Sequence, residues 1–210
     1  MVSEITGRHS RSVDSDVTEG VITTQSNRMK FRLSNALTFS SDESSKDVQL
    51  SDEEFSTILM KYSKNLRIGH ININRVASFN FFELRSLILK SLFDLIVINN
   101  KCKMDHSFPD SHFYIKGFRL YREDRHRFGG GVFIYIRRAL RVTKIHDLER
   151  HEVESITLCV QTPGRAKKVI VIGIYRPPGL LKATWEHEID SILLRSTQRY
   201  KSIMLIGDLH

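Results

Sequence analysis

An alternation of strand-like and helical apolar patterns is the feature that most constrains the fold, and it begins at residue 66. Residues 66–73 (LRIGHINI) have the composition of a buried strand, and residues 79–92 place apolar side chains at helical spacing. Residues 94–98 (DLIVI) then predict a second strand. The whole order, which is a strand, a helix and a strand, then several strands, then a helix and a strand, indicates a mixed sheet system with helices outside it.

The second half of the chain continues this alternation with further strands and another helix. Gly129-Gly130-Gly131 precedes a strongly apolar segment, and Pro163-Gly164 marks a turn between two others. The predicted elements are strands at 132–136, 153–160, 168–175 and 202–206 and a helix at about 184–199 that carries Trp185 on its apolar face. These patterns place residues 66–210 in the α/β class.

The first 65 residues differ from the rest in composition. They hold 13 serines and have 8 Lys+Arg against 10 Asp+Glu, a mixture typical of a flexible, Ser-rich polar extension. Ser51 to Glu54 has the spacing of a capping box ahead of apolar residues, which predicts a short helix at residues 52–62. We therefore divide the chain into a disordered extension, 1–65, and a domain, 66–210.

Composition also excludes several classes of protein. Cys102 and Cys159 lie far apart and the histidines show no zinc-binding spacing, which excludes a disulfide framework and a zinc module. The apolar runs are too short to span a bilayer, and the first residues lack the order of a secretory signal. These features predict an intracellular protein, nuclear or cytoplasmic, that does not bind membranes.

Charge points to a polyanionic partner. Residues 66–210 carry 24 Lys+Arg against 14 Asp+Glu, and such an excess favours binding to a phosphate backbone. The candidate DNA contacts are Arg122, Arg125, Arg127 and Arg176. Charged residues at strand edges also serve solubility and prevent edge pairing, which is the alternative interpretation of the arginines near residue 125.

Polar residues follow or end four of the predicted strands. They are Asn72 and Asn74, Asn99 and Asn100, Tyr175 and Arg176, and Asp208 with His210. Strand ends meet at a shared edge in α/β folds, where such side chains hold Mg²⁺ and phosphate oxygens. Asn and Asp are also common turn formers, so the residues by themselves favour a site and a set of turns equally.

A family resemblance follows from motifs that occur in family order. The motifs are 70–74 (HININ), 121–125 (YREDR) with 129–132 (GGGV), Val153-Glu154, 174–178 (IYRPP) and Gly207-Asp208. Together they resemble the endonuclease/exonuclease/phosphatase domain, in the version found in non-LTR (LINE-type) retrotransposon proteins. The resemblance implies a four-layer α/β sandwich, two packed mixed sheets with outer helices, here incomplete. It also implies a Mg²⁺-dependent phosphodiesterase that nicks DNA.

The resemblance assigns roles to five positions. Asn72 would position the scissile phosphate, Tyr175 would contact it, and Asp208 would orient the attacking water. Asn74 would assist the metal site, and the family's metal-binding Glu falls at Asn100. A divalent cation would offset charge while an oriented water attacks in line.

Three departures from the family pattern predict impaired catalysis. Asn100 is a neutral ligand where the family has a carboxylate, and Lys101 adds positive charge beside it. His210 replaces a second amide, and the sequence stops before the later Asp and His of the family, as in a truncated copy. The alternatives are a non-catalytic nucleic-acid-binding remnant of the same fold and, more distantly, a phosphatase for small phosphorylated substrates.

Overall fold

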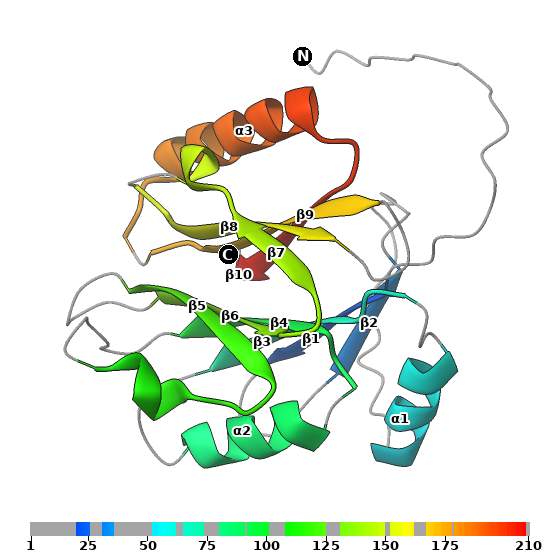
Figure 1. Cartoon of the computed structure of the whole chain (residues 1–210). Coiled ribbons are helices and arrows are strands. Elements are labelled where there is room, and N and C mark those ends of the chain that lie inside the picture. Colours follow the sequence, from blue (N-terminus) through cyan, green and yellow to red (C-terminus); the bar gives the residue numbers. More distant parts are fainter. Residues whose placement is uncertain are drawn as a thin grey trace, which may run out of the picture.

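Two β-sheets pack face to face, and each carries a helix on its outer side (Figure 1). The computed structural model describes residues 20–25, 31–35, 52–61, 65–73, 80–90, 92–100, 108–124, 131–149, 152–161, 167–177 and 179–208. The layers are helix, sheet, sheet, helix, so the predicted four-layer α/β sandwich is confirmed.

The first sheet has the strand order β2-β1-β3-β4-β6-β5. Its strands are β1 (Gly20–Gln25), β2 (Phe31–Asn35), β3 (Ile68–Ile73), β4 (Leu95–Asn100), β5 (Phe118–Asp124) and β6 (Gly131–Arg137). β3 and β4 are parallel and are joined through helix α2 (Asn80–Lys90), whereas β6 is antiparallel to both β4 and β5. The sheet is therefore mixed, as the order of elements along the whole sequence predicts.

The second sheet has the strand order β10-β9-β8-β7. Its strands are β7 (Arg141–Lys144), β8 (Glu154–Gln161), β9 (Lys168–Tyr175) and β10 (Ile203–Asp208). Parallel β9 and β10 are joined through helix α3 (Lys182–Arg199). Two short 3₁₀ helices, η1 (Asp110–Phe113) and η2 (His146–Leu148), complete the described elements.

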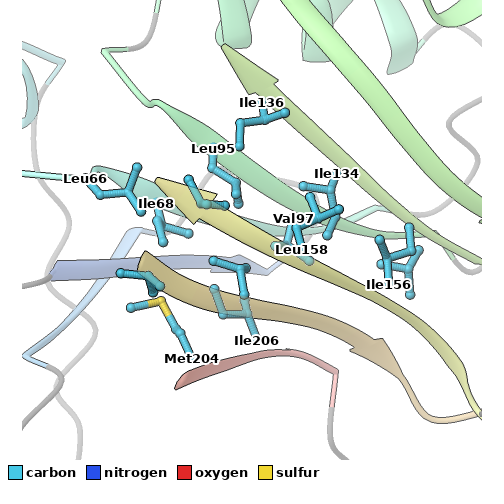
Figure 2. Packing of buried hydrophobic residues seen from close by; sticks show 14 of the residues in the cluster. Leu66, Ile68, Leu95, Val97, Ile134, Ile136, Ile156, Leu158, Met204 and Ile206 are labelled. Atoms are coloured by element: carbon cyan, nitrogen blue, oxygen red, sulfur yellow. The ribbon is translucent and has the colours of Figure 1, made fainter. Parts of the chain in front are cut away.

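The interface between the sheets is an apolar core. Its side chains, many of which Figure 2 shows, come mainly from β3, β4 and β6 on one side and from β8, β9 and β10 on the other. The labelled residues are Leu66, Ile68, Leu95, Val97, Ile134, Ile136, Ile156, Leu158, Met204 and Ile206. Full burial of each aliphatic side chain contributes about 1.5–3 kcal/mol, so this interface is a major source of stability.

Each outer helix buries one face against its sheet. Leu84 and Ile88 of α2, one turn apart, pack with Ile96, Ile98 and other residues of the first sheet. Trp185 and Ile192 of α3 pack on the outer face of the second sheet against Ile170, Ile172 and Ile174. The helical spacing seen in the sequence therefore marks the faces that meet the sheets.

The amino-terminal part contains elements that its composition did not predict. Helix α1 (Asp52–Lys61) lies within the range predicted for a helix, but β1 and β2 form a hairpin whose first strand pairs in parallel with β3. A free strand edge offers unpaired backbone groups, and β1 (GVITTQ) is rich in the β-branched residues that suit a strand. The rest of the predicted extension lies outside the described residues.

In the described ranges, no helix combines the length and the apolar character needed to cross a membrane.

Candidate functional site

The strand ends singled out in the sequence meet at one end of the sandwich. In the first sheet Asn72 of β3 is in register with Asn99 of β4. In the second sheet Tyr175 of β9 is in register with Glu154 of β8 on one side and with Asp208 of β10 on the other. β10 contacts β3 and β4 across the interface, so the two rows face each other. We call the edge formed by these five residues the polar rim.

The polar rim continues the apolar interface with buried polar side chains. Ile68, Leu95 and Val97 line the interface, and the two-residue period of a strand places His70, Asn72 and Asn99 on the same faces. Asn72 is 8% exposed, Asn99 is fully buried and Glu154 is 7% exposed. Buried polar groups require hydrogen-bond partners, so the partners of these side chains decide what the rim can do.

Asn99 connects the two sheets. Its Nδ2 donates a hydrogen bond of 2.9 Å to the backbone carbonyl of Ile174 in β9. Its Oδ1 lies 2.5 Å from Nε2 of the buried His70 in β3. Both polar atoms of this amide therefore have partners inside the protein, so Asn99 holds structure at the rim.

The glycine before the predicted site residue Asp208, Gly207, has a steric explanation. Gly207 is in register with Ile174, and a Cβ atom at this position would lie 1.7 Å from the Ile174 carbonyl oxygen. No side chain fits there unless β10 moves away from β9. The absence of a side chain therefore allows β10 to reach the polar rim beside the carbonyl that Asn99 binds.

The structure brings some of the predicted site residues together. Asn72 and Tyr175 are buried at the rim, the backbone of Asp208 pairs with that of Tyr175, and the backbone of Asn100 pairs with Ile73 and Gly131, one position beyond the pair of Asn72 and Asn99. The remaining predicted residues, Asn74, Arg125, Arg127 and His210, lie outside the described residues.

The two described arginines of the predicted DNA surface have partners within the protein. Arg176 donates a 3.1 Å hydrogen bond from Nη2 to the carbonyl of Leu180, and its guanidinium lies over the ring of Trp185, 6.0 Å from the centroid. Arg176 is half-buried, so it packs against the amino-terminal end of α3. Contact between Arg176 and DNA stays a prediction.

Arg122 is held more tightly, because its side chain is only 10% exposed. Nε donates a 2.9 Å hydrogen bond to Asp124, and Nη1 donates to the Phe108 carbonyl at 2.8 Å and to Asp110 at 3.0 Å. Burial by itself lowers the pKa of Arg122, but hydrogen bonds and charges from Asp124 and Asp110 outweigh burial and raise the pKa above its ordinary value. Arg122 is thus a permanently charged tie between β5 and the η1 region.

The resemblance implies Mg²⁺, and the ligand atoms available at the rim decide whether this ion fits. Among the described residues, no group of three or more His, Cys, Asp or Glu side chains is placed to hold a metal ion. Asn99 uses both polar atoms of its amide within the protein, and Asn100 brings no charge. Hard divalent cations favour several oxygen ligands that include carboxylates. The described residues therefore do not make a Mg²⁺ site, and we derive no step through a metal.

Three residues at or beside the polar rim were quoted as parts of motifs or strand ends in the sequence but received no role there. They are His70, Asn99 and Glu154. Asn99 could have been found from the sequence, because parallel pairing of two strands that both end in Asn brings Asn72 beside one of the two Asn residues of β4. The hydrogen bond between His70 and Asn99 lies within the first sheet, and the register of Glu154 with Tyr175 lies within the second, so both depend on how neighbouring strands pair, which no local pattern reports.

Comparisons with known proteins give the fold a name. The structure of the 3′ phosphatase NExo from Neisseria, bound to a product DNA hairpin, matches with a TM-score of 0.51 and 18% identity over 67% of this chain and 56% of that one. The endonuclease domain of TRAS1, a telomere-specific non-LTR retrotransposon, matches with a TM-score of 0.44 and 13% identity over 65% and 56%. A mannosyl-6-phosphatase from Bacteroides thetaiotaomicron matches with a TM-score of 0.45 and 10% identity over 68% and 64%.

No protein-family model matches the sequence, and no curated protein matches it either. The chain spans a little over half the length of NExo and of the TRAS1 endonuclease domain, 56% in each case. At 18% identity the match to NExo establishes the fold alone, which is that of the endonuclease/exonuclease/phosphatase proteins.

Proposed function

We propose that this chain is part of a DNA-directed phosphodiesterase of the endonuclease/exonuclease/phosphatase type, of the kind found in LINE-type retrotransposon proteins. The observation that carries this function is the polar rim, where the ends of β3, β4, β9 and β10 meet in a fold shared with a DNA-bound phosphatase. The motif order in the sequence supports the retrotransposon assignment.

The chemistry proposed for the rim concerns recognition of an anionic phosphate. The Asn72 amide and the Tyr175 hydroxyl are neutral donors that would bind phosphate oxygens, and the Asp208 carboxylate would orient a water for attack. Burial of Asn72 and Tyr175 supports this assignment, because hydrogen bonds are stronger where water is excluded. Each of these residues comes from a different strand, so their spacing depends on how the two sheets are held.

Hydrolysis is proposed to be impaired as the chain stands. Asn100 replaces the acidic residue that the family uses for its metal, and an amide oxygen supplies no net negative charge. The rim offers neutral amides and the carboxylates of Glu154 and Asp208, so a divalent cation would bind more weakly there than at a site with the additional carboxylate of the family. Substitution of Asn100 by Glu would therefore be the smallest change that restores metal affinity.

A second function, DNA binding without hydrolysis, is favoured by two observations. Residues 66–210 have a strong excess of Lys and Arg, and no cluster of three acidic, His or Cys side chains is placed for a metal in the described part of the chain. Binding through charge requires no metal and weakens as salt rises. The same purified chain serves to separate the two functions.

The test is a supercoiled-plasmid nicking assay with and without Mg²⁺, on the wild-type chain, on Asn100→Glu, and on Asn100→Glu combined with Asp208→Ala or with Asp190→Ala. Asp190 is an exposed carboxylate of α3 and serves as the matched control. We expect slow or undetectable nicking by the wild type, Mg²⁺-dependent nicking by Asn100→Glu, and no effect of Asp190→Ala. Nicking that survives Asp208→Ala would contradict the proposed site.

Binding is measured in parallel by fluorescence anisotropy with a labelled duplex at low and high salt. Salt-sensitive binding without nicking by any variant would favour the non-catalytic function. A folded chain, checked by circular dichroism, that neither binds nor nicks DNA would overturn both functions.

A further inference from the structure

We propose that His70 and Asn99 are positioning residues that set the distance between the two halves of the polar rim. They form a chain of hydrogen bonds from β3 through β4 to β9, that is, from one sheet to the other. The role of this chain in the site rests on the proposed function, whereas the geometry that it imposes does not.

The direction of each hydrogen bond follows from the acceptor at its end. The Ile174 carbonyl only accepts, so the Asn99 atom 2.9 Å from it must be the NH₂ group, because two oxygens there would repel each other. The Oδ1 atom of Asn99 therefore faces His70, and it too only accepts. Nε2 of His70 must then carry a proton. The two bonds are mutually dependent, since a reversal of either would place two acceptors together.

The hydrogen-bond chain ends beside the residues that the proposed function needs. Asn99 is in register with Asn72, so it belongs to the first-sheet half of the rim. Ile174 directly precedes Tyr175 in the sequence and is in register with Gly207, which directly precedes Asp208. Asn72 is thus paired with a member of the hydrogen-bond chain and Tyr175 is bonded to one, while Asp208 follows the glycine that pairs with one.

Apolar packing alone would not set this distance with the same accuracy. The interface below the rim is filled by aliphatic side chains, and their attraction is non-directional, so the sheets could slide slightly at little cost. A hydrogen bond loses strength steeply with distance and angle. Two such bonds in series, with both Asn99 and His70 buried, confine the strand ends to a narrow range of positions.

The first test is by NMR on the full chain and needs no activity. The Ile174 carbonyl and the Tyr175 amide belong to the same peptide group, so the Tyr175 ¹⁵N signal reports the hydrogen bond that Asn99 donates. We expect the His70 imidazole to be protonated at Nε2. We also expect Asn99→Leu and His70→Leu to shift the Tyr175 and Asp208 amide signals, and His70→Gln, which keeps a donor near Nε2, to restore them.

A deprotonated Nε2 in the wild type would overturn the inference, as would Asn99→Leu or His70→Leu spectra whose changes stay within β3 and β4. If Asn99→Leu fails to fold, the comparison of His70→Leu with His70→Gln decides, because both leave Asn99 in place. Unchanged Tyr175 signals in folded His70→Leu, with or without a change in His70→Gln, would also overturn it.

The second test measures whether the hydrogen bonds of Asn99 affect catalysis at the site. In whichever form of the chain nicks DNA fastest, we expect Asn99→Leu to lower kcat about 10- to 100-fold with little change in KM, since displaced groups lose rate more than binding. A shifted Tyr175 signal with unchanged kcat would overturn the positioning role. If no form nicks or binds DNA, the proposed function fails by itself. The NMR result still decides whether the hydrogen bonds of His70 and Asn99 fix the positions of the strand ends.

Discussion

The centre of the interface between the sheets and the polar rim at its end hold the sheets together in different ways. At the centre, fully buried aliphatic side chains such as Val97, Ile134 and Ile156 fill the space. At the rim, contact is made by the Asn99 amide, the His70 ring and a glycine that admits a carbonyl oxygen. The difference teaches that volume determines stability at the centre, whereas direction and the absence of a side chain determine geometry at the rim.

The largest effect on stability is expected at Gly207, where the rim has no space for a side chain. Gly207→Ala places a methyl group against the Ile174 carbonyl oxygen and forces β10 away from β9. We expect a loss of roughly 3–5 kcal/mol in the free energy of unfolding, measured by urea denaturation followed by circular dichroism. Lys201→Ala, at an exposed position just before β10, is the control and should change little. A Gly207→Ala protein as stable as the wild type would show that the rim is looser than described.

The second prediction concerns Gly173, where the centre of the interface has limited room. A Cβ atom there would lie 2.9 Å from Cδ1 of Ile134, so Gly173→Ala overpacks the interface and should cost about 1–3 kcal/mol in urea denaturation. Ile134→Val removes Cδ1 and should recover part of this cost in the double variant. Strict additivity of the two changes would contradict a volume-limited centre.

The third prediction separates stability from geometry at Asn99. Asn99→Leu fills a similar volume but leaves the Ile174 carbonyl without its donor, which should cost about 1–3 kcal/mol in the free energy of unfolding. The fold should survive this cost, while the Tyr175 amide signal shifts. Comparison of the unfolding curve with the NMR spectrum of one sample makes the distinction. Loss of stability without a local shift would mean that Asn99 acts as a packing residue, like those at the centre.

The smallest effect is expected away from both regions, at the exposed pair of Asp147 in η2 and Arg199 in α3. The hydrogen bond from Arg199 lowers the pKa of Asp147 below its ordinary value of 3.8. A lowered folded-state pKa stabilises the protein above pH 3.8, and this contribution is lost as pH falls through the folded-state pKa. Arg199→Ala should return the pKa of Asp147 toward 3.8 in an NMR titration with little change in stability at pH 7. An unchanged titration would mean that the pair is not formed in solution.

The sequence predicted much of the framework and less of the site. The ranges expected for the strands at 66–73, 168–175 and 202–206 and for the helix at 184–199 each contain most of the corresponding element. These elements have strong apolar periodicity, which is local information. The hairpin of β1 and β2 was not predicted, because a strand of modest apolar content depends on the edge of β3 for its hydrogen bonds.

Errors at strand ends had the greatest consequence for the site. The strand predicted at 94–98 continues to Asn100, and the strand predicted to end at residue 206 includes Gly207 and Asp208. When the burial of a strand is unknown, polar residues in the sequence are taken to mark its end. Pairing with β3 and β9 extends both strands, because the neighbouring backbone supplies partners that the sequence does not reveal.

The sequence by itself determined the α/β class, the order of the strongly apolar strands and helices and the residues that would face the sheets, since these follow from periodicity within each segment. It also determined which polar residues lie at strand ends, among them Asn72, Tyr175 and Asp208. Only the tertiary structure decided that Asn99 reaches the Ile174 carbonyl, that His70 supports it, and that Gly207 makes room for that carbonyl. The two hydrogen bonds join residues 29 and 75 positions apart, the first between neighbouring strands of one sheet and the second across the interface between the sheets, so both depend on tertiary contacts rather than on any local pattern.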